Sequence, residues 1–289
     1  MNKLTVVKGL DKYEIILQDY KMIYGLNYNI KFDILRTILR FYKNNKSSEY
    51  AVEENNVARL YINDKEVKPK DILVFHVNKH YSIIDDFKLS TKSLISKYLE
   101  TLLSNESFFD TINTLNILFE SLSQEITIES SVSGCFNTMV PKQLIKLLTP
   151  QYLENDISKD EYDLSLEEII LFQLNLIDYI NKHDNTINHI IICIELPKLT
   201  ETIYSKIKEM KNCYILIFTD LEDSQIEDIS KYYLCENKIL DLADENQVFN
   251  LICDNNYKLL TLKEGREYVE KYIFEKEHEK ARFIMDLLT

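Results

Sequence analysis

The sequence predicts an α/β protein in which a parallel or mixed sheet is interrupted by an inserted helical domain. Two nearly unbroken apolar runs, His189–Ile194 and Tyr214–Thr219, are typical of strands buried on both faces of a parallel sheet. Helical periodicity fills residues 90–183, and an α/β pattern precedes it. We therefore expect a discontinuous α/β head domain, residues 1–89 and 184–289 with a C-terminal helical extension, and an α-helical leg domain, residues 90–183.

The first 89 residues predict short strands around one helix. Ile30–Tyr42 carries its apolar residues at helical spacing. The turn at Asn63–Lys65 and the break at Pro69 separate the last two strands, so part of the sheet is expected to be antiparallel. The predicted strands are Tyr13–Leu17, Lys21–Tyr24, Arg59–Ile62 and Ile72–Val77.

The middle of the chain predicts helices packed side by side. Leu94–Leu103 and Phe108–Leu122 both have apolar residues at intervals of three and four. Ser165 and Glu168 form a capping box that opens a third helix, with apolar residues on one face up to Ile180. The polar stretches Gln124–Asn137 and Glu154–Asp163 are expected to be loops.

The last third returns to alternating strands and helices, the pattern of βαβ units. A long charged helix, Glu264–Leu288, is expected to close the chain. The other predicted elements are a helix from Pro197 to Met210, a helix at Gln225–Leu234, a strand at Lys238–Leu242 and a helix at Val248–Asp254.

Charge is distributed unevenly along the 289 residues, whose net charge is −13. Residues 1–100 contain 17 Lys+Arg and 13 Asp+Glu, a balance of +4, whereas residues 101–289 contain 17 and 34, a balance of −17. A polyanionic partner would therefore meet the first third of the chain. The alternative is an acidic protein with ordinary local variation in charge.

The sequence contains no targeting pattern, and this indicates the cellular compartment of the protein. No apolar run approaches the roughly 20 residues of a membrane span, and the N-terminus lacks the layout of a signal peptide. The five cysteines are far apart and form no C-x-x-C pair, so we expect reduced thiols. The sequence predicts a cytoplasmic protein with no membrane partner.

The segment from Gly25 to Phe32 resembles a phosphate-binding loop (P-loop), G-x-x-x-x-G-K-[ST], that has lost key residues. Gly25 and Lys31 fit the pattern, but Ile30 replaces the second glycine and crowds the approach of a phosphate. Phe32 replaces the hydroxyl residue that would hold magnesium. We expect a degenerate P-loop with no bound nucleotide, no catalytic residue and no enzymatic activity.

Basic side chains surround this loop and are the candidate DNA-binding residues. Lys31 lies at a predicted helix N-terminus, which suits an anion. Arg36, Arg40 and Lys43 share one face of the same helix, opposite its apolar stripe. Three more lysines lie around the turn between the two strands that follow the helix: Lys65, Lys68 and Lys70. An ordinary solvated basic surface is the alternative for each of them.

Metal sites have weaker signals. His76 and His80 lack the helix and the acidic core of an H-E-x-x-H zinc motif. The acidic loop around Glu125 and Glu129 offers oxygen ligands for calcium but lacks the spacing and glycine of an EF-hand. A solvated loop is the alternative.

The order of elements resembles the Csn-two family, the accessory adaptation proteins of type II-A CRISPR–Cas loci, in its long-form variant. The resemblance covers most of the chain as an order of elements. It is carried by the degenerate loop, the inserted helices with Asp110–Leu122 as the long leg helix, the runs Ile190–Glu195 and Tyr214–Thr219, and the helical extension beyond Gly265.

The resemblance implies a ring-shaped homotetramer that encloses double-stranded DNA, prefers free ends and acts in spacer acquisition, part of antiviral defence. It implies partners in the CRISPR integrase complex and the RNA-guided effector nuclease, and no need for ATP. Lys65, Lys68 and Lys70 correspond to ring-lining lysines, with Arg36, Arg40 and Lys43 as neighbours. Calcium would bind near Glu125 and Glu129, where this sequence has Ser, Thr and Gly in place of a dense acidic cluster.

Two other functions remain open from the sequence. A divergent NTPase would use Lys31 with Glu195, the acidic residue that ends the first apolar run. An interaction scaffold would use the acidic helical domain to dock partner proteins, without DNA.

Overall fold

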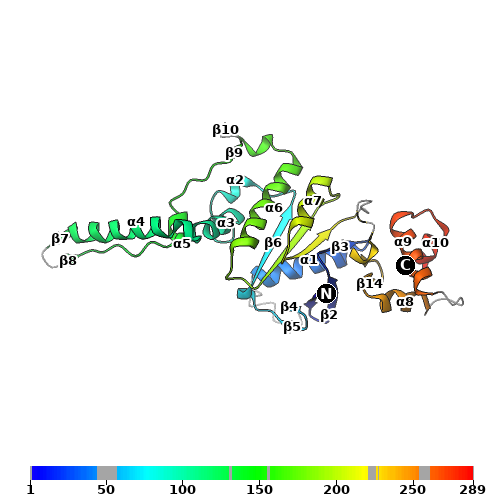
Figure 1. The fold of residues 1–289 in the computed structure, drawn as a ribbon. Coiled ribbons are helices and arrows are strands. Elements are labelled where there is room, and N and C mark those ends of the chain that lie inside the picture. Colours follow the sequence, from blue (N-terminus) through cyan, green and yellow to red (C-terminus); the bar gives the residue numbers. More distant parts are fainter. Residues whose placement is uncertain are drawn as a thin grey trace. The chain divides into compact units, whose positions relative to one another are not determined.

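The computed structural model divides the chain into two compact units (Figure 1). It describes residues 2–43, 57–129, 132–154, 157–220, 226, 228–253 and 261–288. Residues 1–79 and 187–289 form the α/β unit, and residues 80–186 form the helical unit. The boundaries expected from the sequence were at residues 89/90 and 183/184.

A six-stranded sheet forms the centre of the α/β unit. Its strand order is β14-β13-β3-β12-β11-β6, and every neighbouring pair is parallel except β13 with β14 at the edge. The mixed α/β class predicted from the sequence is confirmed. The strands are β3 (Tyr20–Tyr24), β6 (Ile72–Asn78), β11 (His189–Glu195), β12 (Tyr214–Phe218), β13 (Tyr232–Cys235) and β14 (Ile239–Asp241).

A second, antiparallel sheet has the strand order β2-β1-β4-β5. Its strands are β1 (Asn2–Lys8), β2 (Asp11–Leu17), β4 (Ala58–Ile62) and β5 (Lys65–Glu66). The turn between β1 and β2 contains Gly9 in the left-handed region, with φ +61°. β1 was not predicted, and it joins β2 to β4 in this sheet.

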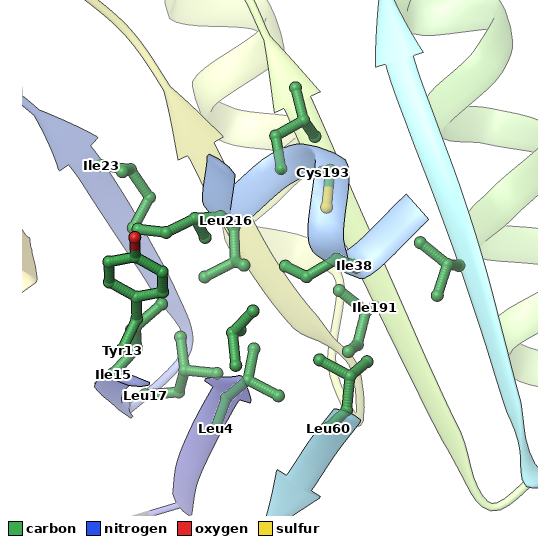
Figure 2. Close-up of a cluster of buried hydrophobic side chains, with 14 of the residues drawn as sticks. Leu4, Tyr13, Ile15, Leu17, Ile23, Ile38, Leu60, Ile191, Cys193 and Leu216 are labelled. Carbon is green, nitrogen blue, oxygen red and sulfur yellow. The ribbon is translucent and has the colours of Figure 1, made fainter. Parts of the chain in front are cut away.

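Helix α1 (Tyr28–Lys43) packs its apolar face against both sheets (Figure 2). Ile38 of this helix lies among Leu4 of β1, Leu60 of β4 and Leu216 of β12. Apolar side chains are removed from water on three elements at once, which stabilises the unit by roughly 25 cal/mol per Å² of apolar area buried. The core therefore fixes where the exposed face of α1 points.

Residues 228–234, the last part of the helix predicted at Gln225–Leu234, do not form a helix. Ile229–Lys231 is a single 3-10 turn, η4, and Tyr232–Cys235 is strand β13, parallel to β3. All four residues of β13 are buried. A strand buried on both faces has no alternating pattern, so its short apolar run looks the same as a helix segment.

The predicted C-terminal helix is in fact two helices. α9 (Leu262–Phe274) begins with the capping box of Thr261 and Glu264, and α10 (Glu279–Leu288) packs back against α9. The chain turns between them at residues 275–278. The other helical elements of this unit are η2 (Pro69–Asp71), α7 (Glu201–Glu209) and α8 (Glu245–Cys253).

One ion pair is buried within the six-stranded sheet, between β3 and β14, which lie on either side of β13. Lys21 of β3 contacts Asp241 of β14, and both side chains are almost fully buried. The Asp241 carboxylate also accepts hydrogen bonds from the amides of Ile16 and Ala243, and the Lys21 amine donates to the carbonyl of Ser230 at 2.8 Å. Burial lowers the pKa of Lys21, against the raising effect of Asp241.

The helical unit confirms the predicted helices and adds short elements between them. Its main helices are α3 (Leu94–Leu103), α4 (Glu106–Glu125) and α6 (Leu166–His183), the last with the predicted Ser165–Glu168 capping box. The polar stretches hold small strands as well as loops. The remaining elements are α2 (Ile83–Asp86), α5 (Pro141–Ile145), η3 (Glu161–Asp163), β7 (Thr127–Glu129), β8 (Val132–Ser133), β9 (Leu153–Glu154) and β10 (Ile157–Ser158).

Helix α3 packs against α5 and α6, and this contact holds the helical unit together. Ile83, Ile95 and Leu164 form its small buried cluster. At the end of α6, the carboxylate of Asp184 is buried and pairs with the Lys97 amine at 2.7 Å. Helix α4, by contrast, has no buried residue among its 20.

The turn before helix α1 and the candidate nucleic-acid interface

Gly25 begins the turn between β3 and α1 and lies directly against the end of β13. Its φ of +128° is unfavourable for any residue with a side chain. A Cβ atom at this position would lie 2.3 Å from the carbonyl oxygen of Cys235. Glycine is therefore required here by the neighbouring strand of the same chain.

The backbone donors that a phosphate would need are already bonded to protein atoms. The Asn27 amide donates to the carbonyl of Cys235 at 2.9 Å, and the Leu26 amide donates to Oε1 of Glu236 at 3.2 Å. The Asn27 side chain accepts the amide of Ile30 at 3.2 Å and donates to the Glu236 carbonyl. This turn is closed by hydrogen bonds within the chain.

Glu236 places a carboxylate at the start of α1, where the positive end of the helix favours an anion. Its side chain is buried, and its Oε1 also accepts a hydrogen bond of 2.9 Å from the phenol of Tyr272 on α9. Burial, together with the charge of Glu236, raises the pKa of Tyr272. The site of a loop-bound phosphate thus contains a carboxylate supplied by the protein.

Lys31 points into the α/β unit. Its side chain is only 7% exposed, and its amine donates to the carbonyl of Thr219 at 3.2 Å and to the carboxylate of Asp220. Both acceptors follow β12, the strand beside β3. The predicted DNA-binding role of Lys31 therefore has little support, because its side chain is buried and its amine is already paired with the half-exposed carboxylate of Asp220.

Glu195 lies at the end of β11, separated from β3 by β12. Its carboxylate is 3.0 Å from Nε2 of His76, which lies on β6, the neighbouring strand on the other side. The two residues that an NTPase would require, Lys31 and Glu195, thus contact different partners, Asp220 and His76.

The basic face predicted on α1 is present on the surface. Arg36, Arg40 and Lys43 are all exposed, on the side opposite the buried residues of the helix. Arg36 stacks on the ring of Phe32, with its guanidinium carbon 5.2 Å from the ring centroid. The spacing of four and three residues therefore produced the expected exposed row.

The second basic group lies on elements next to α1. Lys65 is on β5, Lys68 precedes η2 and Lys70 is within it, and all three side chains are exposed. Helix α1 packs against both β4 and η2. Two basic groups that are about 25 residues apart in the sequence thus belong to neighbouring elements.

Three site residues were missed by the sequence interpretation. Arg59 is exposed on β4, where it pairs across the sheet with Val7, and the alternation of Ala58–Ile62 would have placed it outward. Asp220 and Glu236 had no sequence signal, because each acts on the turn from more than 180 residues away.

The calcium prediction lies on α4 and β7. Glu125 is exposed at the last turn of α4, and Glu129 ends β7. Across the described residues, no group of three or more His, Cys, Asp or Glu side chains is gathered in a way that could hold a metal ion. The side chain of Glu129 lies outside the described residues, so calcium binding there stays a prediction.

In the described parts of the chain, no helix combines the length and apolar character required to cross a bilayer. Cys135, Cys193, Cys213 and Cys235 form no disulfide.

Comparison with known proteins gives a fold and no family. No family model matches the sequence, and no curated protein matches it. Among solved structures, the chain is similar to Stu0660 of Streptococcus thermophilus, with a TM-score of 0.64, 13% identity, and coverage of 94% of this chain and 85% of that one. A recombination mediator protein, RecF with ATP, has a TM-score of 0.41 at 12% identity over 83% of this chain and 98% of its own, which supports no inference. The α/β fold with its inserted helices is thus shared with Stu0660.

Proposed function

We propose that this chain is a non-catalytic protein that binds double-stranded DNA and acts in CRISPR spacer acquisition, as its resemblance to the Csn-two family implies. It binds duplex ends as a ring-shaped homotetramer and works with the integrase complex and the RNA-guided effector nuclease. The observation that carries the proposal is the exposed basic surface of α1 and its neighbours. This basic surface consists of Arg36, Arg40, Lys43, Lys65, Lys68 and Lys70.

The uneven distribution of charge along the chain explains how a protein with a net negative charge can bind DNA as a ring. A ring repeats each basic group once per subunit, and the acidic residues of the later two thirds need not face the lumen. Contacts to phosphates alone are independent of base sequence and weaken steeply as salt displaces them. Arg59 on β4 is a further exposed basic residue of the same unit.

The closed turn supports the absence of nucleotide hydrolysis. A γ-phosphate requires open backbone donors, a free lysine and a metal ligand. Here the donors are bonded to Cys235 and Glu236, Lys31 is bonded to Asp220, and Phe32 has no oxygen. DNA binding is therefore expected without ATP.

The test compares linear and covalently closed circular DNA of one sequence in gel shifts, with a salt titration. Linear DNA should bind more tightly, and Lys65→Glu with Lys68→Glu and Lys70→Glu should abolish the shift. A matched control is Lys142→Glu with Lys146→Glu, two exposed lysines of the helical unit. Equal binding of linear and circular DNA, or no binding of either, would contradict the proposal.

The scaffold alternative draws on helix α4, where Phe109, Ile117 and Leu118 are all at least 60% exposed. Apolar exposure of this kind on one helix favours a protein partner. Loss of spacer acquisition in cells should follow the triple lysine change if DNA binding is the function. If acquisition survives that change and is lost with Ile117→Asp, the scaffold function is favoured.

A further inference from the structure

Helix α1 carries an exposed ridge in which two aromatic residues precede two arginines. Tyr28, Phe32, Arg36 and Arg40 follow one another at intervals of four residues. Such residues are neighbours on a helix surface, with a rise of about 6 Å from one to the next. Tyr28 is 61% exposed and Phe32 is 55% exposed, so both rings remain open to a partner.

Cations hold both rings in place without covering them. The Lys31 amine lies 4.6 Å from the centroid of the Tyr28 ring, and Arg36 stacks on Phe32. Such contacts orient a ring and leave its other face available. The only acidic residue of α1, Asp33, is paired with Lys8 at 2.7 Å. The outer side of the helix therefore combines aromatic surface with positive charge.

A hollow of about 490 Å³ lies beside Tyr28. Its lining includes Asn27, Asn29, Asn237 and Glu236, which present amide and carboxylate groups. This volume is within the range of small-ligand sites and is ample for a nucleobase. The Glu236 carboxylate disfavours a phosphate there, so phosphates are expected at the arginine half of the ridge and bases at the aromatic half.

We infer that Tyr28 and Phe32 stack on unpaired bases at the end of a DNA duplex, whose phosphates lie along Arg36 and Arg40. Aromatic rings accept any base, because every base has a π-face, and positive charge follows the backbone. Paired bases inside a duplex do not expose these faces. The ridge therefore binds a frayed or single-stranded terminus, and this inference rests on the proposed function.

The experiment uses the full chain with three DNA probes of one sequence: a closed circle, a blunt linear duplex and a duplex with a single-stranded extension of about 8 nucleotides. The extension should improve affinity by about tenfold over the blunt end, since each stacked base contributes at this scale. In the Tyr28→Ala/Phe32→Ala variant this advantage should vanish, while affinity for the blunt duplex stays within about twofold. A 2-aminopurine in the extension should be quenched by the wild type and not by the Tyr28→Ala/Phe32→Ala variant.

Two controls separate stacking from other causes. Tyr28→Phe with Phe32→Tyr keeps both rings and should keep the advantage, and Phe109→Ala removes an exposed ring of the helical unit and should change nothing. Blunt duplex binding without any gain from the extension overturns this inference and leaves the proposed function standing. Failure to bind any duplex overturns the proposed function. A double variant that retains the advantage but loses oligomer mass by light scattering assigns the ridge to a protein contact and overturns the stacking.

Discussion

The phenol of Tyr272 donates a hydrogen bond of 2.9 Å to the carboxylate of Glu236, the same carboxylate that accepts the Leu26 amide. Helix α9 is thereby connected to the turn before α1 through one buried anion. This three-part contact replaces the bound phosphate of a nucleotide site with groups that the chain carries itself. Stability, rather than nucleotide binding, should therefore depend on it.

Removing the phenol tests that contact. Tyr272→Phe leaves the buried Glu236 carboxylate with one donor fewer, and a hydrogen bond to a charged group contributes about 1.5–3 kcal/mol. The amides of α9 should lose hydrogen-exchange protection by that amount. Glu236→Gln keeps an oxygen acceptor for both donors and should cost less. Equal losses in the two variants would contradict this expectation and show that the charge of the carboxylate is needed as well as its oxygen.

Gly25→Ala should be among the most damaging single changes in the chain. The new Cβ would collide with the Cys235 carbonyl at an unfavourable φ, at a cost of about 3 kcal/mol or more. Gly9→Ala is the matched control, since its φ of +61° in the β1–β2 turn costs only about 1–2 kcal/mol. Thermal unfolding of both variants measures the difference, and similar melting temperatures would refute it.

Lys31→Ala should lower stability and leave DNA affinity alone. The change removes the donor to the Thr219 carbonyl and the ion pair with the half-exposed Asp220, at about 1–2 kcal/mol. Arg40→Ala should weaken DNA binding and leave stability unchanged, because its side chain is exposed. The dependence of DNA affinity on salt concentration should fall by the equivalent of about one phosphate contact. A Lys31→Ala protein with native stability and weakened DNA binding would restore Lys31 to the DNA surface.

Asp184 should make the helical unit sensitive to acid. Burial opposes its ionisation, but hydrogen bonds from Lys97 and Thr186 outweigh this and lower its pKa. The ionised Asp184 therefore contributes to the free energy of unfolding at pH values above the carboxyl pKa of the unfolded chain, about 3.9. This contribution is lost as the pH falls through the lower pKa of the folded state. The hydrogen-exchange protection factors at the end of α6 should fall as the pH is lowered over that interval in the wild type.

The variant Asp184→Asn should show a flatter pH dependence and a loss of about 1–3 kcal/mol at neutral pH. Asp85→Asn, which breaks an exposed ion pair with Lys88, is the control and should change stability by less than about 1 kcal/mol. Parallel pH profiles for wild type and Asp184→Asn would contradict the assignment.

Local sequence patterns predicted the helices and strands whose apolar residues recur at a regular spacing. They missed the elements whose structure depends on pairing with a strand that is distant in the sequence. The capping box at Ser165 and the apolar stripe of α1 were readable because each is determined within a few turns of chain. β13 was mistaken for a helix, since Tyr232–Cys235 becomes a strand only through pairing with β3. The break between α9 and α10 was missed because residues 275–278 contain no glycine or proline, the residues that usually indicate the end of a helix.

The candidate site likewise contains features that were predictable from the sequence and features that were not. Exposure of Arg36 and Arg40 follows from the helix period, so it was predictable. Burial of Lys31 depends on Asp220, and closure of the turn depends on Glu236, both of which reach it only through the order of strands in the sheet. No motif relates positions so far apart.

The position of β3 in its sheet has a consequence for synthesis on the ribosome. Both of its partners, β12 and β13, begin about 190 residues or more after it in the chain. At roughly 5–20 residues per second, the strand waits on the order of 10–40 seconds for its neighbours. The helical unit is complete first, so the nascent chain carries an apolar strand without a partner, a natural substrate for chaperones.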